Sequence, residues 1–335
     1  MLRASMASPH PVSSPALSLS AARWSPARRA RVSLAAAIVV MGVWGANFAV
    51  TKYVLEHIGV APFLFVRFLA MPVLGFALLA LAYRGRLRDA LPARGDLPRF
   101  AACGLLGHTL HVGIVTWGIS LSTAFSSALV LTSGPLFTLL ILAMLGAERL
   151  HRRQLIGTWV AFLGIVLFLS DKFIGGLASA GAGDLVLLGA ASLFSLYTVI
   201  SRPLADRYGP LALLAWTLAF GAPPTVLATL PAFLAAPLAG VPALAWAGLV
   251  WATVVSAFLG WLVWAWVNTE RGVARSAPLM YLMPPIAGVV AWLTLGELFT
   301  WLKLAGAGVT MGGVAWAQFG GGHPPPPAAA QPDSA

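Results

Sequence analysis

The sequence predicts an all-α polytopic membrane protein in which ten transmembrane helices form two inverted five-helix repeats. Three observations support this fold class: an apolar composition, ten separate apolar runs and an internal repeat. Mean hydropathy is +0.86, with 59% hydrophobic and only 9% charged residues. A soluble domain carries about a quarter charged residues. This chain therefore lacks the polar side chains to cover a water-facing surface, and its long apolar runs are predicted to span a bilayer.

The ten apolar runs follow a basic arm, and each is close to the roughly 20 residues that cross a bilayer. The short connections between them leave no room for an inserted soluble domain. The predicted runs are 34–54, 62–83, 98–119, 124–145, 152–170, 184–202, 210–232, 243–268, 273–296 and 301–319.

The internal repeat relates residues 127–164 to residues 276–313 at an interval of 149 positions, without a gap. Matches of alanine and leucine arise easily by chance in apolar sequences. A proline, a glutamate and two glycines in fixed spacing instead indicate a duplicated half. The informative pairs are Ser127 with Ser276, Pro135 with Pro284, Glu148 with Glu297, Gly157 with Gly306 and Gly164 with Gly313.

The predicted repeats divide the chain into four parts. Residues 1–32 form a basic arm rich in Ser, Pro, Ala and Arg, which we expect to be a disordered cytosolic segment, with an organellar transit peptide as the alternative. The first five-helix repeat covers 33–172 and the second covers 173–319. Residues 320–335 form a disordered cytosolic tail rich in Pro, Gly and Ala. The lone Cys103 excludes a disulfide framework.

The basic residues are distributed unevenly across the predicted membrane. With the N-terminus in the cytosol, 17 basic residues fall on the cytosolic side and 3 on the other side, with Arg67 inside a span. The positive-inside rule therefore predicts that both termini are cytosolic. The net charge of +11 is explained by contact with anionic lipids, and nucleic acid is not required. The three residues on the opposite side are Lys52, Lys172 and Lys303.

Five spans per repeat is an odd number, so the second copy must cross the membrane in the opposite sense. Inverted repeats create a pseudo-two-fold axis in the membrane plane, which suits a protein with one state open to each side. The architecture alone therefore favours transport by alternating access.

Several motifs resemble the EamA-type ten-helix transporters of the drug/metabolite transporter superfamily. They are WGANFAVTK at residues 44–52, PFLFVRF at residues 62–68, and the two copies of the Pro…Glu…Gly pattern. The resemblance covers residues 35–319. It implies a transporter of small metabolites in the bacterial inner membrane, and members of that family often export amino acids. It does not choose a substrate.

Candidate site residues are polar or aromatic side chains near the middle of the spans. Placing Arg67 near the bilayer centre costs about 2.5–3.5 kcal/mol, so it should face the bundle or water. It either stabilises a helix end or receives an anionic group such as a carboxylate. Trp44 and Asn47, one turn apart, either pack between helices or line a central cavity. We predict a substrate site at the repeat interface, lined by Trp44, Asn47, Arg67, His111, Tyr197 and Tyr281.

Other sequence features admit more than one role. His108 and His111 lie three residues apart, and interhelical hydrogen bonding or cavity lining is favoured over metal binding, which needs further ligands. No metal or other cofactor is therefore expected. Gly308 and Gly312 form a GxxxG pair that either packs inside the bundle or joins a homodimer, so the protein is expected to be a monomer or a homodimer.

The sequence favours an amino-acid or metabolite exporter over three alternatives. A nucleophile elbow, a phosphate-binding glycine loop and paired carboxylates are all absent from the sequence, which disfavours an intramembrane enzyme. A lipid-flipping or pore-forming protein is the second alternative. Uptake is the third, because inverted symmetry permits both directions. The expected partners are a small-molecule substrate and the lipid bilayer.

Overall fold

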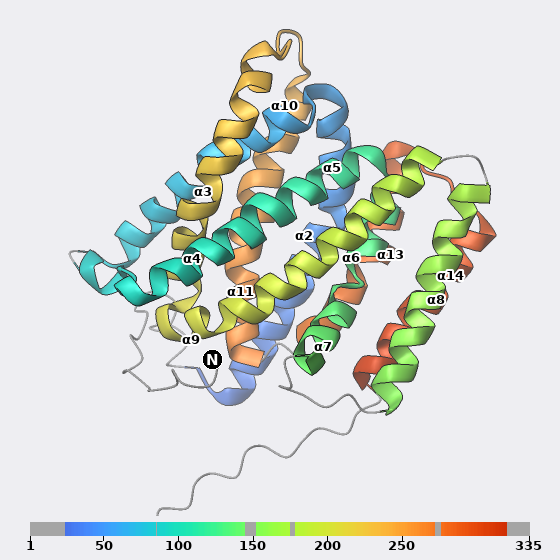
Figure 1. The fold of residues 1–335 in the computed structure, drawn as a ribbon, viewed down its shortest axis with the longest axis horizontal. Coiled ribbons are helices and arrows are strands. Elements are labelled where there is room, and N and C mark those ends of the chain that lie inside the picture. Colours follow the sequence, from blue (N-terminus) through green and yellow to red (C-terminus); the bar gives the residue numbers. More distant parts are fainter. Residues whose placement is uncertain (1–23, 85, 145–151, 175–177, 272–275, 320–335) are drawn as a thin grey trace, which may run out of the picture.

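The computed structural model describes residues 24–84, 86–144, 152–174, 178–271 and 276–319 (Figure 1). No strand occurs among these described residues. The N-terminal half contains α2 (Pro26–Ile58), α3 (Val60–Ala82), η1 (Leu87–Ala90), η2 (Arg94–Asp96), α4 (Leu97–Cys103), η3 (Gly104–Val112), α5 (Gly113–Leu121), α6 (Ala124–Leu131), α7 (Gly134–Met144) and α8 (Arg152–Ile174). The C-terminal half contains α9 (Ala178–Ala235), α10 (Ala243–Val250), η4 (Trp251–Leu259), α11 (Gly260–Arg271), η5 (Ala277–Leu282), α13 (Met283–Leu295) and α14 (Trp301–Phe319).

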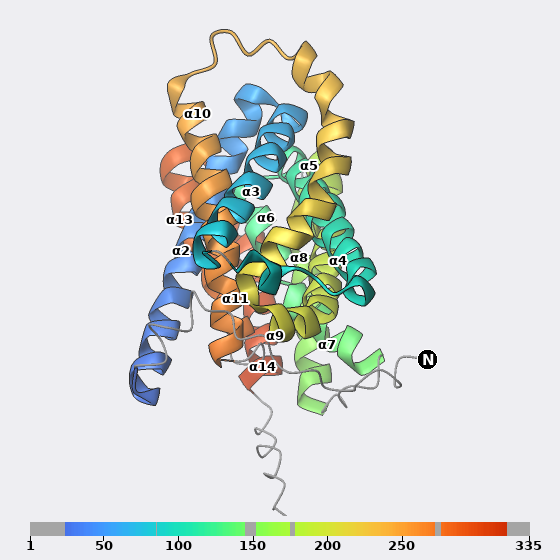
Figure 2. The same ribbon diagram turned by 90° about the vertical axis from the view of Figure 1, so that its left-hand side faces the viewer.

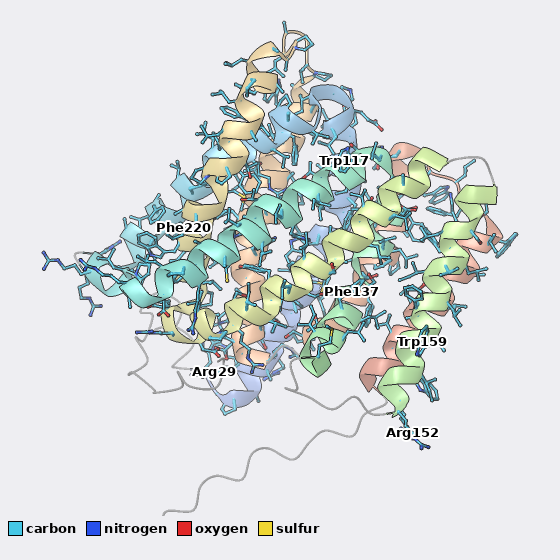
Figure 3. The ribbon with its side chains drawn as sticks, viewed as in Figure 1. Arg29, Trp117, Phe137, Arg152, Trp159 and Phe220 are labelled. Carbon is cyan, nitrogen blue, oxygen red and sulfur yellow. The ribbon has the colours of Figure 1, made fainter. Side chains whose placement is uncertain are left out.

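Helix length and surface character confirm an all-α multi-pass membrane protein. Large apolar side chains such as Trp117 of α5 and Trp159 of α8 project from the bundle (Figure 3), with exposed fractions of 51% and 66%. Such a surface is suited to lipid. Five helical stretches of the described residues are long and apolar enough to cross a membrane: Pro26–Ile58, Val60–Ala82, Arg94–Leu121, Gly181–Ala235 and Ala243–Arg271.

A single glycine reverses the chain direction after the first helix of each half. Gly59 separates α2 from α3 with φ 79° and ψ 170°. Gly209 has φ 78° and ψ 163° and divides α9 into segments 178–208 and 210–235. This conformation is essentially restricted to glycine. Between the predicted runs 184–202 and 210–232, the helix thus continues to Tyr208 and one glycine makes the turn.

The third and eighth predicted runs contain π-helical turns at related positions. In the first half η3 lies between α4 and α5, and in the second half η4 lies between α10 and α11. The first residues of η3 and η4, Gly104 and Trp251, are 147 positions apart. Because π-helical turns shift the hydrogen-bond register and occur frequently at functional sites, these segments are natural places for cavity-lining residues.

The fourth and ninth runs are each interrupted near their centre. Thr132 and Ser133 separate α6 from α7, and in the second half the 3₁₀-helix η5 leads into α13. Pro135 and Pro284 lie in the first turns of α7 and α13. Proline lacks a backbone N–H, but an N–H at this position would find no acceptor within the helix, so nothing is lost. At the first interruption, the Ser195 hydroxyl donates to the Gly134 carbonyl at 2.6 Å.

Helices α8 and α14 pack against each other at one edge of the bundle (Figure 1). A side chain on Gly164, Gly306 or Gly313 would overlap the backbone of the facing helix, so these glycines allow the close approach. Gly308 and Gly312 face open space. Of the two roles considered for this GxxxG pair, packing inside the bundle is therefore wrong, because Gly306 and Gly313 lie on the packed face instead.

Most of the remaining helices share one large apolar core that includes buried residues of α2, α3, α9 and α11. Helix α2 begins at one end of the bundle, and the link from α9 to α10 lies at the opposite end (Figure 2). The long helices thus run roughly end to end and surround the cavities described next.

Candidate functional site

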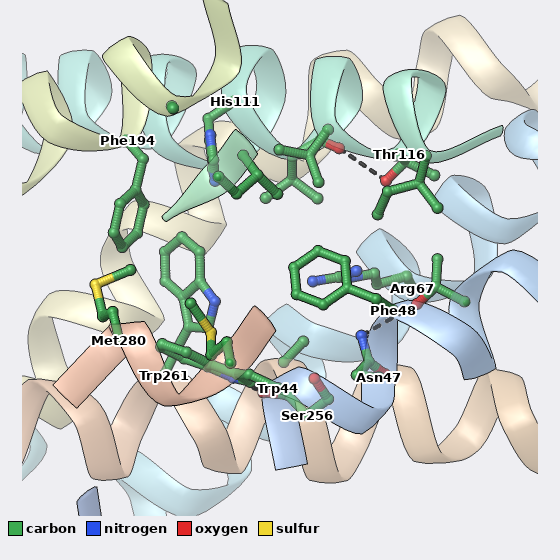
Figure 4. A pocket seen from close by; sticks show the side chains of 18 residues that line it. Trp44, Asn47, Phe48, Arg67, His111, Thr116, Phe194, Ser256, Trp261 and Met280 are labelled. Carbon is green, nitrogen blue, oxygen red and sulfur yellow. Dashed lines mark hydrogen bonds between the residues drawn. The ribbon is translucent and has the colours of Figure 1, made fainter. Parts of the chain in front are cut away.

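A cavity of about 130 Å³ lies among α2, α3, η3, α5, α6, α9, η4, α11, η5 and α13 (Figure 4). We call it the Arg67 cavity, after the charged residue on its wall. The spacing of its α2 residues at positions 44, 47, 48 and 51 follows one face of an α-helix. The lining residues are Trp44, Asn47, Phe48, Thr51, Arg67, His111, Val112, Val115, Thr116, Ile119, Leu131, Ala191, Phe194, Ser256, Ala257, Trp261, Met280 and Met283.

Arg67 brings a positive charge into this cavity without a compensating acid. Its Nε is buried and has no hydrogen-bond partner, and no ion pair to Arg67 is found in the described part of the chain. The guanidinium carbon lies 5.8 Å from the centre of the Phe63 ring. Aspartate and glutamate are absent from the lining residues. A buried cation in this situation favours an incoming anionic group.

Asn47 lies at the same end of the cavity as Arg67 (Figure 4). Its Nδ2 donates to the Thr51 hydroxyl at 3.0 Å, which fixes the orientation of the amide. Its Oδ1 is buried and has no partner within the described residues. This oxygen is therefore available to accept a hydrogen bond from a ligand donor.

Trp44 lies farther along the cavity and is held by a hydrogen bond and by close packing. Its indole Nε1 donates to the Ser256 carbonyl in η4 at 2.9 Å. Its ring lies 5.7 Å from the Trp264 ring, and a side chain on Gly260 would overlap the indole. The π-helical turn of η4 and the adjacent glycine therefore set the position of Trp44.

The two histidines of η3 face different neighbours. The His111 Nδ1 lies 2.9 Å from the Ala190 carbonyl and must donate to it, because a carbonyl oxygen only accepts. The His111 ring lines the Arg67 cavity. His108 is buried and its Nε2 lies 3.0 Å from the Thr217 hydroxyl. It lines neither cavity described here. Within the described residues there is no group of three or more His, Cys, Asp and Glu side chains arranged to hold a metal.

A second cavity of about 180 Å³ lies between α9 and α11. We call it the Asp206 cavity. Both cavities include Trp44, Phe194 and Trp261 in their walls, so these aromatic side chains separate them. The rest of its lining consists of Tyr197, Thr198, Ser201, Arg202, Ala205, Asp206, Pro210, Leu213, Leu214, Trp264, Ala265, Asn268 and Thr269.

The structure brings four of the six predicted site residues together. Trp44, Asn47, Arg67 and His111 line the Arg67 cavity, and Tyr197 lines the Asp206 cavity. Tyr281 lines neither cavity and is buried with Leu136, Ala161 and Val314. Sequence reasoning missed Phe48, Thr51 and Trp261. The helical spacing from Trp44 would have identified Phe48 and Thr51.

The glutamate of the second repeat joins the two halves of the protein. The Glu297 carboxylate accepts hydrogen bonds from the backbone N–H groups of Ala124 at 2.6 Å and Phe125 at 3.3 Å. It therefore caps α6 of the first half through a contact between distant parts of the chain. Glu148 lies outside the described residues.

Comparison with known proteins identifies relatives that are named as amino-acid exporters or efflux pumps. A probable terminal-alkyne amino-acid exporter from Streptantibioticus cattleyicolor is 29% identical over 83% of this chain and 91% of its own length. A probable amino-acid metabolite efflux pump from Salmonella typhimurium is 27% identical, with coverage of 83% and 92%. A solved crystal structure matches with a TM-score of 0.61 at 18% identity, over 86% of this chain and 98% of that one, which shows the shared fold.

The model of the EamA-like transporter family matches the chain twice, at residues 31–170 and 181–318. These ranges contain the motifs on which the resemblance was based and include both cavities' lining residues. The protein is therefore a membrane transporter, and the chain belongs to the EamA-like transporter family.

Proposed function

We propose that the protein is a secondary transporter of the bacterial plasma membrane that exports amino acids or related small metabolites. The observation that carries this proposal is the pairing of an uncompensated Arg67 guanidinium with the free Asn47 Oδ1 on one cavity wall. An α-amino acid has a carboxylate for the guanidinium and an ammonium group for the amide oxygen. A polyamine would require acidic side chains, which the cavity lining lacks.

The apolar part of the same cavity suits an amino-acid side chain. Phe48, Val115, Met280 and Met283 surround the space beyond the polar groups. Methionine adapts to ligands of different shape, and a small number of polar groups within an apolar lining is typical of small-molecule sites. Relatives whose names refer to amino-acid export support the same substrate class.

The two cavities support alternating access between inverted repeats. Eight residues of the Arg67 cavity have equivalents in the other half that line the Asp206 cavity. This relation is expected if each cavity is the opening to one side of the membrane. At an interval of 150 the pairs are Trp44 with Phe194, Asn47 with Tyr197, Phe48 with Thr198 and Thr51 with Ser201. At an interval of 149 they are Val112 with Trp261, Val115 with Trp264, Thr116 with Ala265 and Ile119 with Asn268.

In this proposal ten helices cross the membrane and both termini are cytosolic. The positive-inside rule then puts the Asp206 cavity on the cytosolic side and the Arg67 cavity on the external side. Substrate passes from one to the other when Trp44, Phe194 and Trp261 separate. Binding energy from the substrate can shift this equilibrium only if the two states bind it differently, and the different charges of the two cavities provide such a difference.

Release of amino acids from cells tests the proposed function. Bacteria expressing the protein are loaded with individual radiolabelled amino acids, and release is compared with that from cells carrying an empty vector. We expect fast, saturable release of a restricted set. Release should be inhibited poorly by an amino-acid amide, which lacks the carboxylate, and by the corresponding N-acetyl compound, which lacks the ammonium. Equal release from both kinds of cell would contradict the proposal, and faster net entry would indicate uptake.

A further inference from the structure

The Asp206 cavity carries two opposite charges on one helix face. Arg202 and Asp206 of α9 are four residues apart, so they lie one turn from each other, and both line the cavity. Neither forms an ion pair or a side-chain hydrogen bond in the described part of the chain. Both residues are exposed. A basic and an acidic group are thus both available to a ligand in this cavity.

Neighbouring charges do not neutralise this pair. The Arg207 Nη1 donates to the Asp96 carboxylate at 2.5 Å, and the Tyr208 hydroxyl donates to the same carboxylate at 2.7 Å. Arg207 is therefore engaged away from Asp206. Across the cavity, Asn268 of α11 has a buried Oδ1 without a hydrogen-bond partner among the described residues. This oxygen is a second acceptor for a cationic group.

The equivalent charges in the first half are arranged differently. Lys52 and Glu56 of α2 precede Arg202 and Asp206 by 150 positions, and their side chains are 4.0 Å apart. The Lys52 Nζ also donates to the Ser120 carbonyl at 2.9 Å, near the end of α5. Neither Lys52 nor Glu56 lines the Arg67 cavity. The same pair of charges therefore stabilises the structure in one half and is available to a ligand in the other.

We propose that Arg202, Asp206 and Asn268 form a second binding site, which recruits zwitterionic amino acids from the cytosol before they reach the Arg67 cavity. The inference rests on the proposed amino-acid export. Arg202 receives the carboxylate, while Asp206 and the Asn268 Oδ1 receive the ammonium group. Because exposed ion pairs contribute little, the site binds weakly and raises the local substrate concentration. Since Lys52 and Glu56 do not line the Arg67 cavity, recruitment acts on substrate from the cytosol only.

Transport into inside-out membrane vesicles tests the recruitment site, because these vesicles present the cytosolic face to the medium. The probe is the radiolabelled amino acid that cells release fastest in the export assay. We expect Asp206→Asn and Arg202→Gln to raise the half-saturating concentration by about two- to fivefold, the effect of losing one exposed ionic contact. The maximal rate should stay within about twofold of wild type, because Arg67 is untouched.

Competing compounds show whether each charge acts on the expected group. The methyl ester of the amino acid keeps the ammonium, so Asp206→Asn should weaken its inhibition. The N-acetyl derivative keeps the carboxylate, so Arg202→Gln should weaken its inhibition. Glu56→Gln, at the equivalent position of the first half, is the matched control and should change neither competition. A double variant that exchanges the two residues, Arg202→Asp with Asp206→Arg, should recover part of the lost affinity.

The outcomes separate this site from the proposed function. Suppose that wild-type vesicles transport the amino acid and Arg67→Ala vesicles do not. If the Asp206 and Arg202 variants then keep the wild-type half-saturating concentration, the recruitment site is refuted while export stands. If wild-type vesicles transport no amino acid, both proposals fail. A raised half-saturating concentration that is the same with substrate on either membrane face would also refute recruitment from the cytosol.

Discussion

The two halves of the protein have related backbones but different charges at the cavities. In each half a glycine with positive φ follows the first helix, and a π-helical turn interrupts the third membrane-crossing segment. Arg67 of α3 nevertheless has Thr217 as its equivalent 150 positions later. Thr217 is buried and contacts His108, whereas Arg67 lines a cavity. The comparison shows that related backbones surround two cavities, while unmatched side chains give each cavity its chemistry.

Arg67 and Thr217 should give the largest functional difference between the halves. Arg67→Ala removes the cation that we assign to the substrate carboxylate. A hydrogen bond to a charged group contributes about 1.5–3 kcal/mol, so transport of carboxylated substrates should fall at least roughly tenfold. Arg67→Lys should restore transport only in part, because an ammonium lacks the planar pair of donors. The measurement is initial export rate, normalised to protein in the membrane.

Thr217→Ala is the matched control for that experiment. It removes the hydroxyl next to His108 but no cavity-lining group, so it should lower stability by about 1 kcal/mol and leave substrate affinity unchanged. If Arg67→Ala and Asn47→Ala were both present at normal levels and transported normally, the assignment of the Arg67 cavity as substrate site would be wrong.

The two turn glycines should respond alike and so test the symmetry of the backbone. Gly59→Ala and Gly209→Ala each force a side chain into a conformation that costs about 1–3 kcal/mol. We expect similar decreases in the midpoint of thermal unfolding in detergent. Gly42→Ala in α2 and Gly189→Ala in α9 are the controls, since both glycines are helical and a side chain there meets no neighbouring atom. These controls should be neutral or stabilising. A loss at only one turn would show that the two connections are not equivalent.

The sequence predicted the regular part of this architecture well. Apolar runs and the 149-residue register depend on composition and spacing, which a helix preserves along its length. The same regularity explains why Trp44 and Asn47 lie on one wall. Arg67 lines a cavity, consistent with the cost of exposing a charge to lipid.

Irregular helical turns explain most of what the sequence could not predict. His108 and His111 are three residues apart, a spacing that puts side chains on one face of an α-helix. A π-helix turns less per residue than an α-helix, so only His111 reaches the cavity. Tyr281 belongs to the 3₁₀-helix η5, in which side chains three residues apart eclipse each other. Met280 and Met283 therefore face the cavity together, and Tyr281 points elsewhere.

Long-range contacts were beyond sequence reasoning for a different reason. The Glu297 carboxylate caps α6, which begins more than half the chain earlier. No local pattern marks such a contact, because the two groups meet only after both halves have packed. The free Arg202 and Asp206 pair was likewise hidden, since four-residue spacing of opposite charges usually indicates a helix-stabilising ion pair.

The smallest expected difference concerns the aromatic residues between the cavities. Trp44 and Phe194 are equivalent, but only Trp44 donates a hydrogen bond, from Nε1 to the Ser256 carbonyl. Trp44→Phe makes both positions phenylalanine and removes that hydrogen bond, which typically contributes about 0.5–1.5 kcal/mol. We expect a correspondingly small decrease in the unfolding midpoint, together with faster exchange between the two cavities because the wall is held less firmly.

The control for this change is Trp264→Phe. It replaces the neighbouring indole with a smaller phenyl ring, and the Trp264 side chain forms no hydrogen bond among the described residues. It should cost only the apolar area by which an indole exceeds a phenyl ring, and leave the exchange rate unchanged. The exchange rate is measured as counterflow of radiolabelled amino acid in vesicles with substrate on both sides, where only movement between the two openings contributes. If both variants accelerate counterflow equally, loss of ring size and not of the Ser256 contact loosens the wall. If Trp44→Phe alone does so, the hydrogen bond to η4 holds the wall closed, and the π-helical turn that positions the Ser256 carbonyl is part of the gate.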